Sequence, residues 1–129
     1  MIVNISSTHS ANLCCNDALT FSENKNWDFS VRNFVGVFQD SIKSSGIFVL
    51  YTNMIEQDDG NLPRAICYIH LEGGSSYVNY SPTQPLRYKL RFHDMSQTLF
   101  TFRSLGSNRE IIFKEAAFQI EITETYGRF

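Results

Sequence analysis

In the segment IHLEGG, two side chains that could ligate a metal are separated by a single residue, namely His70 and Glu72. Imidazole nitrogen and carboxylate oxygen are common zinc ligands, usually in spacings such as H-x-H or H-E-x-x-H. The chain has three histidines, His9, His70 and His93, and none occurs in such a spacing. We therefore expect His70 on the face of a strand, Glu72 at the start of a turn, and no metal site.

A cluster of carboxylates occupies the segment EQDDGN, where Glu56, Asp58 and Asp59 fall within four residues. Such oxygens bind Ca²⁺, but an EF-hand loop needs ligands at alternating positions and a closing glutamate, which this segment lacks. Asp59 is followed by Gly60, a pair that favours a tight hairpin because glycine adopts positive φ at no steric cost. The pattern predicts a solvated hairpin tip.

The thiols are the remaining candidates for catalysis. Cys14 and Cys15 are adjacent, and a nucleophilic pair would need positive charge nearby to stabilise a thiolate. Only His9 is close in sequence, and no G-x-S-x-G, phosphate-loop or S-x-x-K motif occurs. The sequence predicts no enzyme, no catalytic residue and no cofactor, although a spatial cluster of titratable residues stays open. With Cys67 distant, we expect three reduced thiols, as in cytosolic or nuclear proteins.

A basic row lies in the segment PLRYKLRFHD (85–94), where Arg87, Lys89 and Arg91 alternate with apolar residues. The alternation predicts a strand whose other side enters the core through Leu86, Tyr88, Leu90 and Phe92. Such a row could follow a phosphate backbone, but the aromatic rings point away from it and the net charge is −2. Nucleic acid is therefore disfavoured. We expect the row to pair with acids such as Glu121 and Glu124, or with a neighbouring protein.

The rest of the chain consists of short apolar or alternating runs separated by turn residues, which is typical of all-β proteins. Strands are expected at 1–5, 18–21, 27–31, 34–38, 46–55, 64–71, 77–80, 85–94, 98–103 and 118–123. Residues 111–117 fit either a strand or a helical turn. The run 46–55 is apolar on both faces and so predicts a central strand. Gly36 is expected at a bulge or a bend, and the segments 72–76 and 104–110 at turns.

Individual side chains are assigned to faces by the two-residue period of a strand. Inward positions are Trp27, Phe29, Val31, Phe100, Phe102, Phe118, Ile120 and Ile122. Outward positions are Asp28, Ser30, Gln119 and Glu121. Residues 98–103 are expected to return against residues 85–94 as the second strand of a hairpin.

The composition supports a folded β protein. Of 129 residues, 43% are hydrophobic and 19% charged, and eleven Phe and six Tyr favour pleated, half-buried surfaces. No apolar run is long enough to span a bilayer as a helix, and the N-terminus has no signal-peptide pattern. We predict one domain over residues 1–129, a two-sheet antiparallel sandwich of about eight strands. The absence of a Cys…Trp…Cys pattern favours a jelly roll over an immunoglobulin domain.

Five segments occur in an order that resembles a viral family: WDFSVRNF, IFVLYTNMI, LPRAICYI, YSPTQPLRYKLRFHD and TLFTF. The chain resembles the single jelly-roll proteins that serve as minor or penton-like capsid components of polinton- and adintovirus-type viruses. Shared features include the Tyr-x-Asn-x-Ile element at 51–55 and the Tyr-x-Pro stretch at 80–82. The matches extend from Trp27 to Phe102. The chain departs from the family after Asp94, where MSQ stands in place of an expected glycine.

The resemblance implies a non-catalytic capsid or virion-associated subunit that assembles with itself or with other virion proteins. It also implies synthesis in the cytoplasm or nucleus of a host cell and then a place in the virion. Candidate contact residues are Arg87, Lys89, Arg91, Tyr77, Tyr80, Tyr126 and Phe129. The alternative is a module that binds a carbohydrate or host protein, because exposed tyrosine rings stack on sugar faces.

Overall fold

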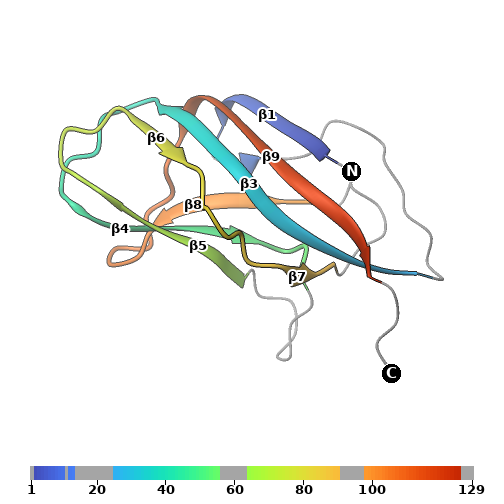
Figure 1. Ribbon diagram of the computed structural model, residues 1–129. Helices are drawn as coiled ribbons and strands as arrows, with labels where there is room; N and C mark the ends of the chain where they lie inside the picture. The colour runs from blue at the N-terminus through green and yellow to red at the C-terminus, as the bar shows by residue number, and fades with distance from the viewer. Residues whose placement is uncertain (1, 11, 14–24, 56–63, 91–97, 126–129) are drawn as a thin grey trace.

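The computed structural model describes residues 2–10, 12–13, 25–55, 64–90 and 98–125, and these residues form two antiparallel sheets (Figure 1). The strands are β1 (Ile2–Ser10), β2 (Asn12–Leu13), β3 (Asn26–Phe38), β4 (Gly46–Thr52), β5 (Arg64–Leu71), β6 (Tyr77–Tyr80), β7 (Tyr88–Lys89), β8 (Phe100–Ser104) and β9 (Phe113–Thr125). The described residues contain no helix. The predicted all-β, two-sheet antiparallel sandwich is confirmed.

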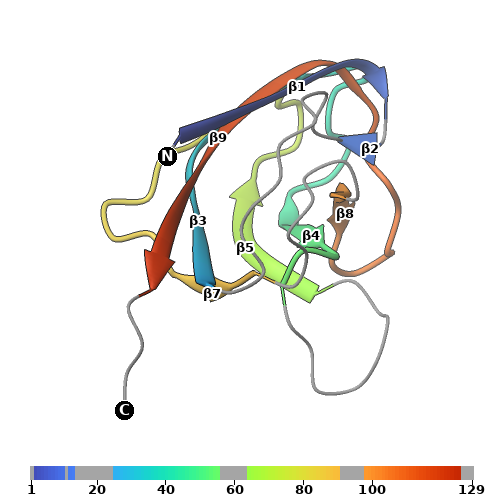
Figure 2. The same ribbon diagram turned by 90° about the vertical axis from the view of Figure 1, so that its right-hand side faces the viewer.

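The first sheet has the strand order β1-β9-β3-β6, and β7 also pairs with β3. The second sheet has the order β2-β8-β4-β5. Figures 1 and 2 show β1, β9 and β3 side by side in one layer and β8, β4 and β5 in the other. With β7 set aside, the pairs are nested: β4 with β5, β3 with β6, β2 with β8, and β1 with β9. The chain therefore runs as one long antiparallel hairpin that is folded over two layers.

Phenylalanine rings from both sheets fill the space between the layers. Phe34 of β3 meets Phe102 of β8 edge to face, with ring centroids 5.5 Å apart. Phe100 of β8 meets Phe118 of β9 in the same way at 4.8 Å. All four rings are almost completely buried, so these pairs add directional contacts to the burial of apolar surface between the sheets.

Most of the expected strands are present. The run at 46–55 contains β4, which is an interior strand of its sheet, and Phe48, Val49 and Leu50 are all buried. Residues 64–71 and 77–80 form β5 and β6, and Ser75 N–H donates to the Glu72 carbonyl (3.1 Å) in the predicted turn between them. The ambiguous segment 111–117 is extended and enters β9 at Phe113. In β9 the inward positions Phe118, Ile120 and Ile122 are buried as predicted.

The strand expected at 85–94 is much shorter in the structure. Only Tyr88 and Lys89 form β7, Leu90 makes an isolated bridge with Ile55, and residues 91–97 lie outside the described residues. Leu86 is 67% exposed, so its assignment to the core was wrong. Pro82 and Pro85 lack the N–H groups that a ladder needs, so pairing starts only after them.

The hairpin expected between 85–94 and 98–103 was also wrong. The strand β7 pairs with β3 in the first sheet, whereas β8 lies between β2 and β4 in the second. Between these two strands the chain therefore passes from the first sheet to the second instead of turning back within one sheet.

Two details of β3 differ from the expected alternation. Ser30 was assigned outward, yet it is buried together with its neighbours Phe29 and Val31, next to a register shift between Val31 and Asn33. The irregularity expected at Gly36, as a bulge or a bend, falls one residue later, since the other register shift lies between Val37 and Phe38. Gly36 itself lies against the ring of Phe113.

Candidate functional site

The basic row is only partly within the described residues. Arg87 is exposed ahead of β7, and Lys89 is exposed within it, opposite Asp28 of β3. Arg91 lies outside the described residues. Lys89 takes part in an interaction within the fold, so it is not a free charge waiting for a ligand. The row is thus at most two described cations beside a strand of two residues.

The acids expected to pair with that row have other partners. Glu121 Oε2 lies 3.0 Å from Arg32 Nη1, and Glu124 Oε2 lies 3.6 Å from Lys25 Nζ. The salt bridges of these two acids that the structure describes are therefore made to cations outside the row, and Arg91 is not among the described residues. This follows from the strand order, since β9 lies next to β3, on the side of β3 away from β6.

The two described tyrosines among the candidate contact residues, Tyr77 and Tyr80, differ in surroundings, although both belong to β6. Tyr77 is 61% exposed on the outer face of the first sheet. Tyr80 is half-buried and packs against the core, close enough to the Cys67 thiol for the two groups to influence each other's pKa. Tyr126 and Phe129 lie outside the described residues.

Tyr77 belongs to an exposed apolar patch that extends over β3 to β9. Val37 of β3 is the direct cross-strand neighbour of Tyr77, and Val35 of β3 is the direct neighbour of Ala117 in β9. Val35 and Val37 are 38% and 40% exposed, and Ala117 is exposed as well. Because residues two apart on a strand share a face, these four side chains form one group, which we call the sheet patch. It belongs to rigid strands and not to loops.

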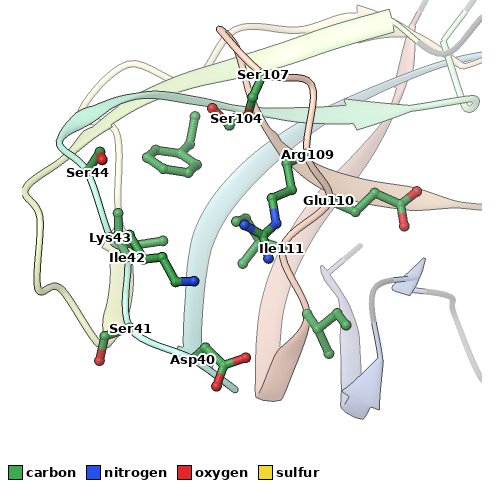
Figure 3. Close-up of a pocket in the computed structure, with 12 residues that line it drawn as sticks. Asp40, Ser41, Ile42, Lys43, Ser44, Ser104, Ser107, Arg109, Glu110 and Ile111 are labelled. Atoms are coloured by element: carbon green, nitrogen blue, oxygen red, sulfur yellow. The ribbon is translucent and has the colours of Figure 1, made fainter.

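A pocket opens at one end of the sandwich, between the β3–β4 connection (39–45) and the β8–β9 connection (105–112), as Figure 3 shows. Backbone hydrogen bonds hold this end together. Gln39 N–H donates to the Ile112 carbonyl, and Ile42 N–H donates to the Ser75 carbonyl, both at 2.9 Å. Ser104 N–H donates to the Arg109 carbonyl at 3.0 Å, which closes the second connection. Hydrogen bonds therefore join the two connections to each other, and join the β3–β4 connection to the β5–β6 turn.

The pocket, which we call the end pocket, has a volume of about 540 Å³. Its lining comprises Asp40, Ser41, Ile42, Lys43, Ser44, Phe48, Ser104, Ser107, Arg109, Glu110, Ile111 and Ile112. Ile42 and Phe48 are buried and belong to the core, so the pocket reaches the apolar interior. Figure 3 shows the Lys43 and Arg109 side chains extending toward one another across the space. The pocket thus combines an apolar floor with two cationic side chains.

The two cations of the end pocket, Lys43 and Arg109, are not neutralised by salt bridges within the described residues. Glu110 forms a salt bridge with Arg103, and Figure 3 shows its carboxylate turned away from the cavity. Asp40 lies at one edge of the pocket. Among the described residues, neither Lys43 nor Arg109 forms a salt bridge. Two cations and one uncompensated carboxylate therefore face the same space.

The Cys67 thiol is buried in the core, and burial raises its pKa to about 11, while the interaction with Tyr80 acts in the opposite direction. Burial, followed by the influence of Cys67, also raises the pKa of Tyr80 and of Tyr88. The Tyr88 hydroxyl donates to the Ile66 carbonyl at 3.0 Å. A thiol with a raised pKa is a poor nucleophile, so this cluster suits packing better than catalysis.

His70 and Glu72 are close but exposed, with Nδ1 3.7 Å from Oε1. As expected, His70 lies on β5 and Glu72 starts the turn after it. Within the described part of the chain, no three His, Cys, Asp or Glu residues gather as metal ligands would. The acids Glu56, Asp58 and Asp59, the pair Cys14 and Cys15, and His93 lie outside the described residues, and the side chain of His9 is not described.

The sequence did not identify Lys43 or Arg109 as site residues. Each is a single cation in a polar connection, DSIKSSG or SLGSNRE, where charge is ordinary. The sequence shows only one cation in each of two turns. These cations indicate a site only once the strand order is known, because the strand order brings the two turns together.

No protein-family model matches the chain, and neither a curated protein nor a solved structure matches it. In the residues that the structure describes, there is no helix with the length and apolar character needed to cross a membrane.

Proposed function

We propose that this protein is a non-catalytic structural subunit that self-associates through the sheet patch and belongs to a viral capsid or virion. The observation that carries the proposal is the patch itself: Val35, Val37, Tyr77 and Ala117 present adjoining apolar surface on the outer face of the first sheet. Contiguous exposed apolar groups of this kind mark interaction surfaces more often than isolated ones do. Tyr77, on the β6 side of the patch, is of a residue type that often contributes strongly to interfaces.

The strand order supports the viral part of the proposal. A jelly roll has eight strands arranged in two sheets and is the fold of many capsid subunits, although lectin domains and cupins share it. The nested pairing of β1 with β9, β2 with β8, β3 with β6 and β4 with β5 is what a hairpin rolled into such a fold would produce. We infer a jelly roll with β7 as a short addition. Since one fold serves several functions, the surface and not the fold must decide between them.

The occupant that we propose for the sheet patch is a second copy of this chain. In a two-fold interface the same patch is used by both copies, so the surface must be complementary to itself. The edge of the patch meets this requirement in charge, because Lys114 and Glu115 are adjacent and exposed, and Glu115 lies opposite Val37. Lys114 of one copy would then face Glu115 of the other, which fixes the register of the contact.

Sedimentation velocity over a range of protein concentrations tests the association. The unaltered chain should sediment faster as its concentration rises. A Val37→Lys, Tyr77→Ser double variant should remain a monomer, because it places a charge in the patch and removes its largest ring. A monomer at every concentration of the unaltered chain would refute self-association.

The second sheet supplies a matched control. Ile47 and Tyr68 are exposed to 38% and 62%, close to the 40% and 61% of Val37 and Tyr77. An Ile47→Lys, Tyr68→Ser double variant makes the same chemical changes on the opposite face and should associate like the unaltered chain. Equal loss of association in both variants would show that the patch has no special role. Thermal unfolding of both variants confirms that they are folded.

Mass spectrometry of purified virus particles tests the virion assignment. Peptides of this chain should be present in particles from cells that produce it. Their restriction to the fraction without particles would contradict a virion subunit and would leave self-association as a separate question.

The alternative function, ligand binding, is favoured by a different observation, which is the end pocket. Its residues do not overlap the sheet patch. The carbohydrate version of this alternative relied on Tyr77, Tyr80 and Tyr126. Tyr77 and Tyr80 do not line the pocket, and Tyr126 lies outside the described residues.

A further inference from the structure

We propose that the end pocket binds a small organic anion, in which a phosphate or carboxylate group is joined to a compact apolar body. This inference deepens the ligand-binding alternative and is independent of association through the sheet patch. A chain that associates but binds no anion would overturn it and leave the main proposal standing.

The charge of the ligand follows from the two cations. Lys43 and Arg109 come from different connections, and Figure 3 shows them directed into one space. Because neither has a salt bridge within the described residues, both keep their N–H donors for a ligand. Guanidinium presents paired donors that match the oxygens of a carboxylate or phosphate, while ammonium acts as a point charge beside them. Glu110 does not cancel this charge, because it pairs with Arg103.

The apolar body of the ligand follows from the floor. Ile42 and Phe48 are core residues, and Ile111 packs partly against the same core. A bare inorganic ion would leave this surface in contact with water, whereas a small ring or short aliphatic group would cover it. The hydroxyls of Ser44, Ser104 and Ser107 line the pocket as well and offer donors or acceptors.

The size of the pocket agrees with a small molecule. Its volume of about 540 Å³ lies within the roughly 300–1,000 Å³ that is usual for ligand pockets. The pocket is also fixed in place, because Gln39, Ile42 and Ser104 each donate a backbone hydrogen bond that ties its walls together. A ligand would therefore not have to order the connections as it binds, which favours affinity.

Titration of the full chain with phenyl phosphate, followed by amide NMR shifts, tests the proposal. Shifts should saturate with a Kd of about 1 mM or lower and should map to residues 40–44 and 104–112. Inorganic phosphate should bind more weakly, because it cannot cover the apolar floor. Binding of the two compounds with equal affinity would overturn the organic part of the proposal.

Charge variants give the sign of the interaction. A Lys43→Gln, Arg109→Gln double variant should raise the Kd roughly tenfold, since each exposed contact is of salt-bridge size. Asp40→Asn should lower the Kd about twofold, because it removes the one uncompensated carboxylate at the pocket edge. Opposite changes from these two variants are a pattern that general loss of folding cannot produce.

A Lys25→Gln, Arg32→Gln double variant is the control for net charge. It removes the same number of positive charges, at two exposed positions that pair with Glu124 and Glu121 and do not line the end pocket. Its Kd should equal that of the unaltered chain. The proposal is overturned by shifts that do not saturate, by shifts that map elsewhere, or by equal weakening in the control variant.

Discussion

Gly36 of β3 lies directly against the ring of Phe113 at the start of β9: a β-carbon added to Gly36 would stand 2.5 Å from Cε1 of that ring. The ring cannot move away easily, because Phe113 is fully buried and contacts the rings of Phe34, Phe38 and Phe102. The absence of a side chain at Gly36 therefore leaves room for the Phe113 ring to pack in the aromatic core.

Substitution Gly36→Ala should destabilise the protein by about 1–3 kcal/mol, the usual cost of overpacking a core. Urea unfolding followed by fluorescence of the single tryptophan measures the change. Gly46→Ala is the matched control, because nothing lies within 4 Å of a β-carbon added at Gly46. An unchanged midpoint for Gly36→Ala would mean that Phe113 is free to move.

The ring pair between Phe100 and Phe118 should show a measurable coupling energy. Its centroids are 4.8 Å apart and its planes are nearly perpendicular, at 80°. In a double-mutant cycle with Phe100→Leu and Phe118→Leu, the double variant should lose about 0.5–1.5 kcal/mol less than the sum of the two single losses, because each single change already removes the pair. A control cycle uses Phe48 and Phe118, which form no ring contact, and should be close to additive. Additivity for both pairs would show that the edge-to-face geometry adds nothing to burial.

Thr52 at the end of β4 should be sensitive to an isosteric change. Its hydroxyl donates to the Leu99 carbonyl at 3.0 Å and accepts from the Met54 N–H at 3.1 Å, and the residue is almost fully buried. Thr52→Val keeps the shape but leaves both backbone groups without this partner, at a cost of about 1–3 kcal/mol. Thr123→Val, at a half-exposed position of β9, should change stability by less than about 0.5 kcal/mol. Chemical denaturation compares the two.

The Cys67 thiol should resist alkylation in the folded protein. Burial raises its pKa to about 11, so little thiolate exists near neutral pH. In a Cys14→Ser, Cys15→Ser background, iodoacetamide at pH 8 should modify Cys67 only as fast as the protein unfolds. Rapid modification under native conditions would contradict the burial of this residue.

Stability should fall at high pH for the same reason. The thiol pKa is 9.0 in its ordinary state and about 11 in the folded protein. Between these values the folded state keeps a proton that the unfolded chain has released, so the free energy of unfolding falls as the pH rises. Tyr80 and Tyr88, whose pKa values are also raised, act in the same direction. Cys67→Ala should therefore reduce the fall measured by urea unfolding between pH 9 and 11, and an identical profile would contradict the assignment.

Several elements could be predicted because their signals are local. The two-residue alternation of FQIEIT set Phe118, Ile120 and Ile122 inward, and the structure buries all three. The same rule failed for Leu86, where prolines delay pairing until Tyr88. Alternation assigns a face only after a strand exists, and whether a short run becomes a strand depends on a partner elsewhere in the chain.

The sequence by itself determined a β-rich chain with a phenylalanine core, since strand period, turn residues and composition are local properties. Tertiary structure alone decided the strand order, and with it the partners of Glu121 and Glu124 and the sheet patch around Val37 and Tyr77. It also decided that Lys43 and Arg109 face one pocket. The physical reason is that nested pairing joins segments far apart in the sequence, and their contacts depend on packing between sheets, which no local pattern encodes.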